Sequence, residues 1–291
     1  IEIRRLSGVL GAEITNVNVA RLTDTEFEQI QQALLEHGVI VIRDQDIVPG
    51  QQVEFAKRWN DLHVHPYLRG LEEHPEVIEV VKEPEERGGF GAHWHTDQIF
   101  TPAPAMATML YAKEVPQFGG DTMFASMHAA YDALSPGMQA MLRGVRTFNQ
   151  YDKSAPRTGT MASKVTSNES AADMSSHPLI RVHPETGRPA LYINDMETTR
   201  HLDGMTEAES APLLRFLLAH ATRPEFTCRV NWEVGSLAIW DNRQVLHMAL
   251  NDYHGQRRFM HRITIQGDVP FGLDEDAGDA PPVRVGAAQA S

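Results

Sequence analysis

The chain has 291 residues, of which 42% are hydrophobic and 22% are charged, a composition that suits a globular protein with a large buried core. Its 26 basic and 39 acidic residues give a net charge of −13, which argues against nucleic acid and anionic membranes as partners because both favour a basic surface. No apolar run approaches the roughly 20 residues that span a bilayer. A cytoplasmic location is therefore the simplest prediction.

The N-terminal part of the chain alternates short apolar stretches with helical patterns. Thr23 and Glu26 form the signature of a capping box, and apolar residues at helical spacing follow them. The predicted elements, in chain order, are a hairpin within residues 3–19, a helix that begins at 23–26, a buried strand at 39–42, a helix at 51–59 and a strand at 77–81.

Two polar stretches are predicted to be loops that cover a site. Residues 83–91 are charged and rich in glycine, which predicts a mobile loop. Residues 154–176 are rich in Ser, Thr, Ala and Gly and contain few large apolar side chains. Because a structureless insert of this length inside a compact domain is more often a functional lid than a linker, we interpret it as a lid, with plain disorder as the alternative.

From residue 105 onward strands are predicted to dominate, with helical patterns at 129–142 and 206–221. The second helix is expected to bury a stripe of apolar side chains, made of Ala208, Ala211, Leu214, Leu217 and Leu218. The one cysteine, Cys228, has no internal disulfide partner, and its place in an apolar stretch predicts a small buried hydrophobe.

The order of these elements predicts the fold and its limits. Short strands with helices before and between them suit a mainly β fold with flanking helices, namely a double-stranded β-helix or jelly roll whose interior can hold a ligand. We expect residues 1–271 to form a single domain. Residues 272–291 are expected to be a polar C-terminal tail, because they lack the apolar surface needed to fold.

The most informative feature of the sequence is the run His95-Thr96-Asp97, followed far along the chain by His247. If the run is extended, His95 and Asp97 lie on one face, because side-chain direction repeats every second residue of a strand. With one distant histidine they can form the 2-His-1-carboxylate triad, which binds non-heme Fe(II) and leaves coordination positions open. Arg258, beyond His247, supplies a bidentate fork suited to the carboxylate of a 2-oxo acid.

Other histidines compete with these as metal ligands. His93 has the same strand parity as His95, and the residues alone do not choose between the two. His254 and His261 are the alternatives to His247. His254 lies in a predicted turn, and if the segment that follows is a strand, His261 points away from the face that carries its arginines. This reasoning leaves His247 as the distal ligand.

Several motifs surround these residues in a characteristic order. They are Trp94-His95-Thr96-Asp97, Gly119-Gly120-Asp121-Thr122, Ile239-Trp240-Asp241-Asn242-Arg243, His247 and Gln256-Arg257-Arg258-Phe259-Met260-His261-Arg262. With them, over residues 8–271, the chain closely resembles the taurine dioxygenase family of Fe(II)/2-oxoglutarate-dependent oxygenases, which includes alkylsulfatases and phenoxyalkanoate dioxygenases. The resemblance implies a jelly roll that uses Fe(II), with 2-oxoglutarate and O2 as co-substrates. We also expect a homo-oligomer, either a dimer or a tetramer.

The resemblance implies roles for individual residues. It selects His95, rather than the histidine two residues earlier, as a metal ligand together with Asp97 and His247. It implies that Arg258 pairs with the distal carboxylate of 2-oxoglutarate and that Thr122 donates its hydroxyl to the same group. A capping or strand threonine is the alternative interpretation of Thr122.

The resemblance also implies a site for an anionic substrate. Arg262 matches the family position that binds the anionic head of the substrate, and His65 matches its partner. An arginine that is buried without a local acid needs such an anion, since burying an unpaired charge is costly; a surface salt bridge is the alternative. Asp241 and Asn242 are expected to make supporting contacts rather than to touch substrate. The substrate is thus expected to be a small organic anion: a sulfonate, a sulfate ester or a carboxylate.

The rest of the expected substrate site departs from the taurine-specific pattern. The departures are Leu68, Gly91, Gln98 and Glu197, together with Tyr67, which is displaced by one residue. We therefore expect taurine to be a poor substrate and a bulkier anion to fit, with the hydroxylated product able to collapse and release its leaving group. The alternatives are an oxygenase that cleaves aryloxyalkanoate ethers or only hydroxylates, a non-catalytic 2-oxoglutarate-binding protein and, as the least expected, a zinc hydrolase.

Overall fold

The computed structural model describes residues 1–65, 68–151, 160–165 and 174–275. Among these residues the largest sheet has eight strands, of which only β2 and β3 form a parallel pair. The strands run in the order β1 (Glu2–Arg5), β2 (Ala12–Thr15), β3 (Val39–Ile42), β14 (Leu237–Asp241), β6 (Ala107–Glu114), β16 (Arg258–Ile265) and β4 (Leu62–His63), and β5 (Ile78–Lys82) pairs with β16.

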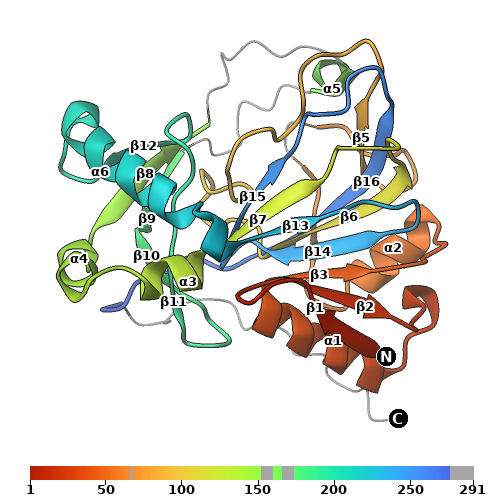
Figure 1. Cartoon of the computed structure of the whole chain (residues 1–291), viewed down its shortest axis with the longest axis horizontal. Coiled ribbons are helices and arrows are strands. Elements are labelled where there is room, and N and C mark those ends of the chain that lie inside the picture. Colours follow the sequence, from red (N-terminus) through yellow and green to blue (C-terminus); the bar gives the residue numbers. More distant parts are fainter. Residues whose placement is uncertain (66–67, 152–159, 166–173, 276–291) are drawn as a thin grey trace.

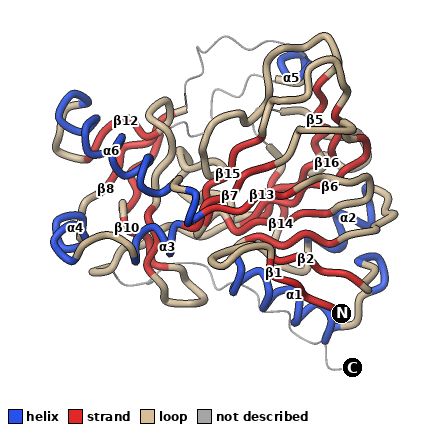
Figure 2. Tube along the Cα trace, viewed as in Figure 1, coloured by secondary structure: helices blue, strands red, loops and turns tan. Residues whose placement is uncertain are grey.

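A second antiparallel sheet shares a core with the large sheet. Its strands are, in order, β13 (Thr227–Val230), β7 (Thr122–Ser126) and β15 (Val245–Ala249). Phe124 and Val230 from this sheet belong to the same buried cluster as Val41 and Trp240 from the large sheet. Two sheets packed over one core are the architecture of a jelly roll, so the predicted mainly β fold is confirmed. Figure 2 shows the strands in the centre of the molecule and the helices at its edges.

The strand predicted at residues 39–42 is β3, and both of its faces are buried. Val39 and Val41 pack into the cluster between the two sheets, whereas Ile40 and Ile42 pack into a second cluster beneath the N-terminal helices. A strand covered on both faces is continuously apolar rather than alternating, which explains the run of four β-branched residues.

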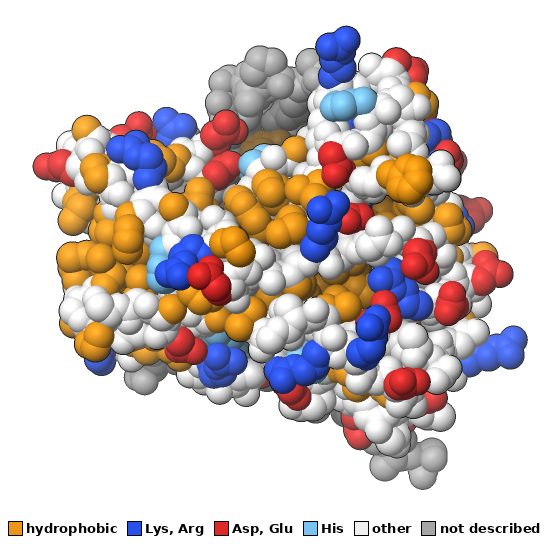
Figure 3. Space-filling model, viewed as in Figure 1, with side chains coloured by type: hydrophobic (Ala, Val, Ile, Leu, Met, Phe, Trp, Pro, Cys, Tyr) orange, Lys and Arg blue, Asp and Glu red, His pale blue; other side chains and the backbone are white. Residues whose placement is uncertain are grey.

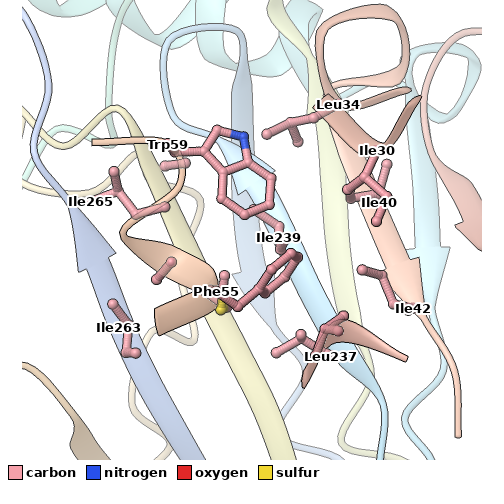
Figure 4. Close-up of a cluster of buried hydrophobic side chains, with 14 of the residues drawn as sticks. Ile30, Leu34, Ile40, Ile42, Phe55, Trp59, Leu237, Ile239, Ile263 and Ile265 are labelled. Atoms are coloured by element: carbon pink, nitrogen blue, oxygen red, sulfur yellow. The ribbon is translucent and has the colours of Figure 1, made fainter. Parts of the chain in front are cut away.

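Two N-terminal helices cover the outer face of the large sheet (Figure 1). The helix α1 (Asp24–His37) begins with the predicted capping box between Thr23 and Glu26. The helix α2 (Pro49–Ala56) starts and ends earlier than the predicted 51–59. It starts at Pro49 because proline suits the first helical turn. Trp59, just beyond it, packs against Phe55 with ring centroids 4.9 Å apart. Figure 4 shows both aromatic rings among isoleucine and leucine side chains of α1, β3, β14 and β16.

Helices and two small sheets form the other side of the molecule (Figure 1). The helices are α3 (Met127–Asp132), α4 (Pro136–Leu142) and α6 (Glu207–Ala221). One small sheet consists of β12 (Thr199–Leu202), β8 (Arg146–Gln150) and β9 (Met174–Pro178), and the other of β10 (Ile180–Val182) and β11 (Pro189–Leu191). The structure also contains two 3-10 turns, Val19–Arg21 and Pro224–Phe226.

Two helical predictions need correction. The single helix predicted at 129–142 is two helices, because Ser135 caps a new helix and Pro136 has no N–H with which to continue the first one. The helix α6 lies within the predicted 206–221, and Leu214 and Leu217 of the predicted stripe are buried, whereas Ala208 is exposed. The buried stripe consists of Ser210, Leu214, Leu217 and Ala221.

The predicted lid and tail are described only in part. Within 154–176, residues 160–163 form the short helix α5 (Thr160–Ser163) and residues 174–176 belong to β9, so these parts are not structureless. Residues 164 and 165 are described as well, and Val165 forms a bridge with Leu68; residues 154–159 and 166–173 of the predicted lid lie outside the described residues, as do residues 276–291 of the predicted tail. The first tail residues contact the body, since Asp274 pairs with Arg143 and Glu275 pairs with Arg146.

Charged side chains of both signs are mixed on the surface. Figure 3 shows Lys and Arg side chains interspersed with Asp and Glu over one face of the molecule. Of the described helices, none is long and apolar enough to cross a membrane. Cys228 is buried in β13 as predicted, and burial raises the pKa of its thiol to about 12.

A buried ion pair ties the small β10–β11 sheet to the segment that follows β16. Arg181 Nη2 lies 2.7 Å from an oxygen of Asp268, and the two side chains are 0% and 4% exposed. Replacing Asp268 with alanine leaves a buried guanidinium unpaired, so we expect Asp268→Ala to lower the free energy of unfolding by about 3–5 kcal/mol in urea titrations. Asp274→Ala, which removes an ion pair on the surface, is the control and should change stability little. Equal losses in the two variants would contradict this account.

Candidate active site

The three predicted metal ligands lie together beside β15, an edge strand of the second sheet. Ligand atoms of His95, Asp97 and His247 all lie within 4.8 Å of one another, which is close enough for one metal ion to contact all three. His247 belongs to β15, and His95 is held beside it by two backbone hydrogen bonds of 3.0 and 2.8 Å between these two residues. The run containing His95 is therefore an isolated bridge rather than the expected strand, and Asp97 begins a turn.

The competing histidines are not part of this cluster. His95 Nδ1 lies 2.7 Å from the backbone oxygen of His93, so in the neutral ring Nδ1 donates and Nε2 is left free to bind a metal. The side chain of His93 is 52% exposed, and its nearest acid is Asp195. His254 lies in an exposed turn. His261 packs edge-on against Phe259 on the outer face of β16, as strand parity predicted.

The electrostatics of the cluster suit a divalent metal. Burial lowers the pKa of both His95 and His247, so the imidazoles are neutral and keep a lone pair available near neutral pH. Burial alone would raise the pKa of Asp97, but the charge of Arg262 is the largest of the opposing effects, and the net pKa falls below the usual range. A carboxylate beside two neutral imidazoles is the donor set that non-heme Fe(II) prefers.

A chain of hydrogen bonds orients the carboxylate of Asp97. Thr108 Oγ1 donates to Asp97 Oδ2 at 2.5 Å, and Asn242 Nδ2 donates to Thr108 Oγ1 at 3.0 Å. The Asn242 side-chain oxygen accepts from Trp240 Nε1 at 3.1 Å, which fixes the amide. Asn242 therefore supports the carboxylate through Thr108, in agreement with its predicted supporting role. Asp241 makes structural contacts, with a hydrogen bond to His183 and an ion pair with Arg243.

The predicted co-substrate residues Arg258 and Thr122 are both buried and both contact Trp232. Arg258 is 6% exposed, and its Nε and Nη2 atoms have no hydrogen-bond partner among the described residues. Its guanidinium lies 5.5 Å from the ring centre of Trp232, and Trp232 Nε1 donates to Thr122 Oγ1 at 3.0 Å. Burial lowers the pKa of Arg258 to about 10, so it stays cationic at neutral pH. Nothing in the sequence pattern around Trp232 indicated its place here.

Arg262 has a local acid, which corrects one premise of the sequence analysis. Its Nη2 lies 2.8 Å from Asp97 Oδ1, and both side chains are buried. The sequence analysis missed this acid because Asp97 is close to Arg262 in space but far from it in the sequence, in the turn after His95. Arg262 also lines a cavity of about 640 Å³ beside the cluster, so the same side chain faces both the candidate metal ligand and the space for a substrate.

His65 lines the same cavity in its neutral form. Its Nδ1 accepts a hydrogen bond of 3.2 Å from the backbone N–H of Leu68. Burial and the charge of Arg262 lower the pKa of His65 to about 3, so the ring carries no charge over the physiological range. The residue contributes hydrogen bonding rather than charge to the cavity.

Some of the positions that depart from the taurine pattern line the cavity, and others do not. Leu68, Gly91 and Gln98 line it, whereas Glu197 is exposed in a turn and does not; the neighbouring Thr198 does. Gly91 has a φ of +72°, and a Cβ atom there would lie 3.2 Å from Cε1 of His95. Glycine is thus favoured at this position for two reasons besides any space it leaves for substrate: the backbone has a positive φ, and a Cβ atom would crowd the ring of His95. Tyr67 lies outside the described residues.

The cavity walls contain aromatic and apolar groups that the sequence analysis did not single out as site residues. Phe100 and Tyr151 stack with ring centroids 4.8 Å apart, and both line the cavity. Met161, from the short helix α5, adds a flexible apolar side chain. These residues lie in loops and in a one-turn helix, where no periodic pattern marks them in advance.

The fold and this cluster together define a jelly-roll oxygenase of the Fe(II)/2-oxoglutarate-dependent class. Residues 2–264 match the family described as "Taurine catabolism dioxygenase TauD, TfdA family", and the chain belongs to it. An alpha-ketoglutarate-dependent sulfate ester dioxygenase of Pseudomonas putida is 32% identical over 94% of this chain and 92% of its own length. Enzymes of this family use Fe(II), 2-oxoglutarate and O2, and so does this one.

Solved structures agree with this assignment. A taurine dioxygenase from Burkholderia xenovorans matches with a TM-score of 0.81 and 34% identity, over 94% of this chain and 92% of that one. The structure of AAD-2 in complex with Mn(II) and N-oxalylglycine matches with a TM-score of 0.74 and 28% identity, over 92% of this chain and 98% of that one.

The hydrogen bond from Thr108 to Asp97 generates a prediction about metal affinity. Thr108→Val keeps the shape of the side chain but removes the donor, so we expect roughly 10- to 100-fold weaker binding of Mn(II) or Fe(II) in competition titrations. Thr264→Val is a matched control: this buried threonine lies directly across from Thr108 on β16, and its hydroxyl has no partner in the described part of the chain. Equal metal affinity in the two variants would show that the bond to Asp97 is unimportant.

Proposed function

We propose that His95, Asp97 and His247 hold the Fe(II) of this dioxygenase and that Arg258 and Thr122 hold the distal carboxylate of 2-oxoglutarate. The proposal rests on the closeness of the three ligand atoms, together with the burial of Arg258, whose Nε and Nη2 atoms have no hydrogen-bond partner among the described residues. A buried guanidinium without an anion is costly, and a carboxylate fits its fork.

Bound Fe(II) with 2-oxoglutarate and O2 supplies the oxidant that converts a substrate C–H bond into C–OH, with succinate and CO2 as co-products. The residues of the chain orient the reactants. Arg258 and Thr122 fix the far end of the co-substrate, Thr108 and Asn242 fix the Asp97 carboxylate, and the loop around Gly91 lies against the His95 ring. The protein thus contributes orientation and exclusion of water rather than acid–base chemistry.

We propose a small organic anion as the substrate, with its charged head at Arg262 and His65. Arg262 uses one donor on Asp97, and its guanidinium has further N–H groups available for an anion. His65 is neutral and offers hydrogen bonding without a second charge. A guanidinium fork suits a sulfonate, a sulfate ester or a carboxylate about equally, so the body of the substrate decides specificity.

The cavity walls support a substrate body larger than that of taurine. Leu68, Phe100, Tyr151 and Met161 supply apolar surface where the amine of taurine would need polar partners. The stacked rings favour the second candidate function, an oxygenase that hydroxylates the carbon next to the ether oxygen of an aryloxyalkanoate. A hydroxylated carbon that bears an ether, sulfate or sulfonate group can collapse to a carbonyl and release that group.

The complete ligand set gives no support to a non-catalytic 2-oxoglutarate-binding protein, whose simplest signature is a lost ligand. Residues 86–91 line the cavity, and the closure of loop 83–91 over a bound substrate stays a prediction. The cytoplasmic location and the dimeric or tetrameric assembly also stay predictions.

Metal binding tests the proposed ligands directly. We expect alanine at His95, Asp97 or His247 to remove tight Mn(II) binding and to abolish succinate formation, because each change takes one of three protein ligands. His254→Ala and His261→Ala are the controls and should keep both properties. A metal-bound crystal structure with either control histidine on the metal would overturn the assignment.

Substrate preference tests the anion site. We expect kcat/KM for longer alkyl sulfates or aryloxyalkanoates to exceed that for taurine, and Arg262→Ala to lower kcat/KM for every anion by roughly 100-fold, the loss that follows from leaving a buried anion unpaired. Because Arg262 also contacts Asp97, Mn(II) affinity is measured on the same variant to separate the two effects. Efficient turnover of taurine would contradict the specificity, and an Arg262→Ala variant active on all anions would contradict the site.

A further inference from the structure

Lys82, the last residue of β5, is a buried cation with no role in the proposed metal, co-substrate or substrate contacts. The residue is 5% exposed, and its Nζ atom has no hydrogen-bond partner among the described residues. Nζ lies 4.3 Å from the ring centre of Tyr253, and the residue lines the cavity beside the candidate metal site. An ammonium group that is taken out of water without an acceptor is costly, so its burial needs an explanation.

The position of Lys82 places it next to Arg258. The two residues are directly opposite each other in the antiparallel pairing of β5 and β16, and residues so paired project to the same face. Arg258 is close enough to Tyr253 that its charge lowers the pKa of that phenol, against the larger rise that burial causes. Two buried cations therefore share one aromatic neighbour, an arrangement that repels unless an anion lies between them.

Two acids are close enough to act on these cations by charge, since Lys82 lowers the pKa of Glu86 and Asp121 opposes the fall that burial causes in the pKa of Arg258, but neither acid accepts a hydrogen bond from them. Asp121 accepts hydrogen bonds from Arg229 and Asn231. Glu86 accepts hydrogen bonds from the backbone N–H of Glu83 and from the Thr160 hydroxyl. Neither carboxylate forms a hydrogen bond to Lys82 or to the unpartnered donors of the arginine opposite it.

We propose that Lys82 is a second cationic contact for the distal carboxylate of 2-oxoglutarate, opposite Arg258. The inference rests on the proposed co-substrate site and adds to it a residue that the sequence analysis did not identify. The guanidinium fixes the direction of the carboxylate through its planar fork, and the ammonium group adds a compact point charge on the other side. The co-substrate carboxylate then supplies the hydrogen-bond acceptor that neither cation has among the described side chains.

The register of β16 assigns Lys82 to the co-substrate rather than to the primary substrate. Arg262, the candidate anion site for the substrate, lies opposite Ile78 rather than opposite a cation. Arg258 and Arg262 are four residues apart on one strand, which separates them by roughly 13 Å at the usual rise per residue. Lys82 is therefore at the co-substrate end of the cavity.

The experiment measures binding of two 2-oxo acids to the Mn(II)-loaded protein by isothermal titration calorimetry. One ligand is 2-oxoglutarate, and the other is 2-oxopentanoate, which keeps the 2-oxo acid head but lacks the distal carboxylate. We expect Lys82→Met to weaken 2-oxoglutarate roughly 10- to 100-fold, as for loss of a buried hydrogen bond to a charged group, and to leave 2-oxopentanoate within about twofold. Lys82→Arg, which keeps the charge, should recover most of the affinity for 2-oxoglutarate.

Two further variants make the result specific. Lys113→Met removes a lysine from β6, a strand that pairs with β16 as β5 does. Its Nζ also lies over a tyrosine ring, that of Tyr111, but the residue does not line the cavity. It should bind both ligands as the unmodified protein does. Arg258→Met tests the proposed function on its own, because it should weaken 2-oxoglutarate whatever Lys82 does.

Three results would overturn the inference about Lys82. The first is unchanged binding of 2-oxoglutarate by Lys82→Met, and the second is equal weakening of both 2-oxo acids, which marks a purely structural role. The third is a fall in kcat/KM for the anionic substrate with 2-oxoglutarate binding unchanged. If Arg258→Met binds 2-oxoglutarate normally, the proposed co-substrate site itself is wrong. If Lys82→Met does not fold, the comparison of the unmodified protein with Lys82→Arg and Lys82→Gln gives the same decision, since only the glutamine variant should lose affinity.

Discussion

Two backbone hydrogen bonds between His95 and His247 are the interaction on which the site depends. They join a loop to the strand β15 and place the two imidazole rings with centroids 4.1 Å apart. Asp97 follows in the turn and reaches the same space, where Thr108 and Arg262 hold its carboxylate. Because side-chain direction alternates along extended backbone, a shift of one residue in this bridge would separate the ligand atoms. The jelly roll provides the fixed strand against which the loop can register.

Burying cationic side chains in the interior of the fold costs free energy, and bound anions can offset that cost. Lys82, Arg258 and Arg262 project from paired strands into space that burial has largely removed from water. Only Arg262 has a described acid as partner, and that acid is the candidate metal ligand Asp97. If the proposed site binds metal, co-substrate and an anionic substrate, these ligands offset the cost of the buried charges, and ligand binding then stabilises the fold.

The sequence by itself determined what depends on local physics. The capping box at Thr23, the doubly buried run at 39–42 and the parity of β16 follow from backbone periodicity and hydrogen bonding between near neighbours. The parity of β16 was enough to turn His261 outward and the arginines inward. The family motifs then identified the class of reaction, because the ligand types and their order are chemically restrictive.

Only the tertiary structure decided which distant groups meet. It showed that the segment before Asp97 is a bridge and turn rather than a strand, that Arg262 has an acid within reach, and that Glu197 lies outside the cavity. It also brought Lys82 opposite Arg258, although the sequence around Lys82 reads only as the end of a strand. Contacts between residues far apart in the chain depend on sheet register and on loop paths, which no local pattern encodes.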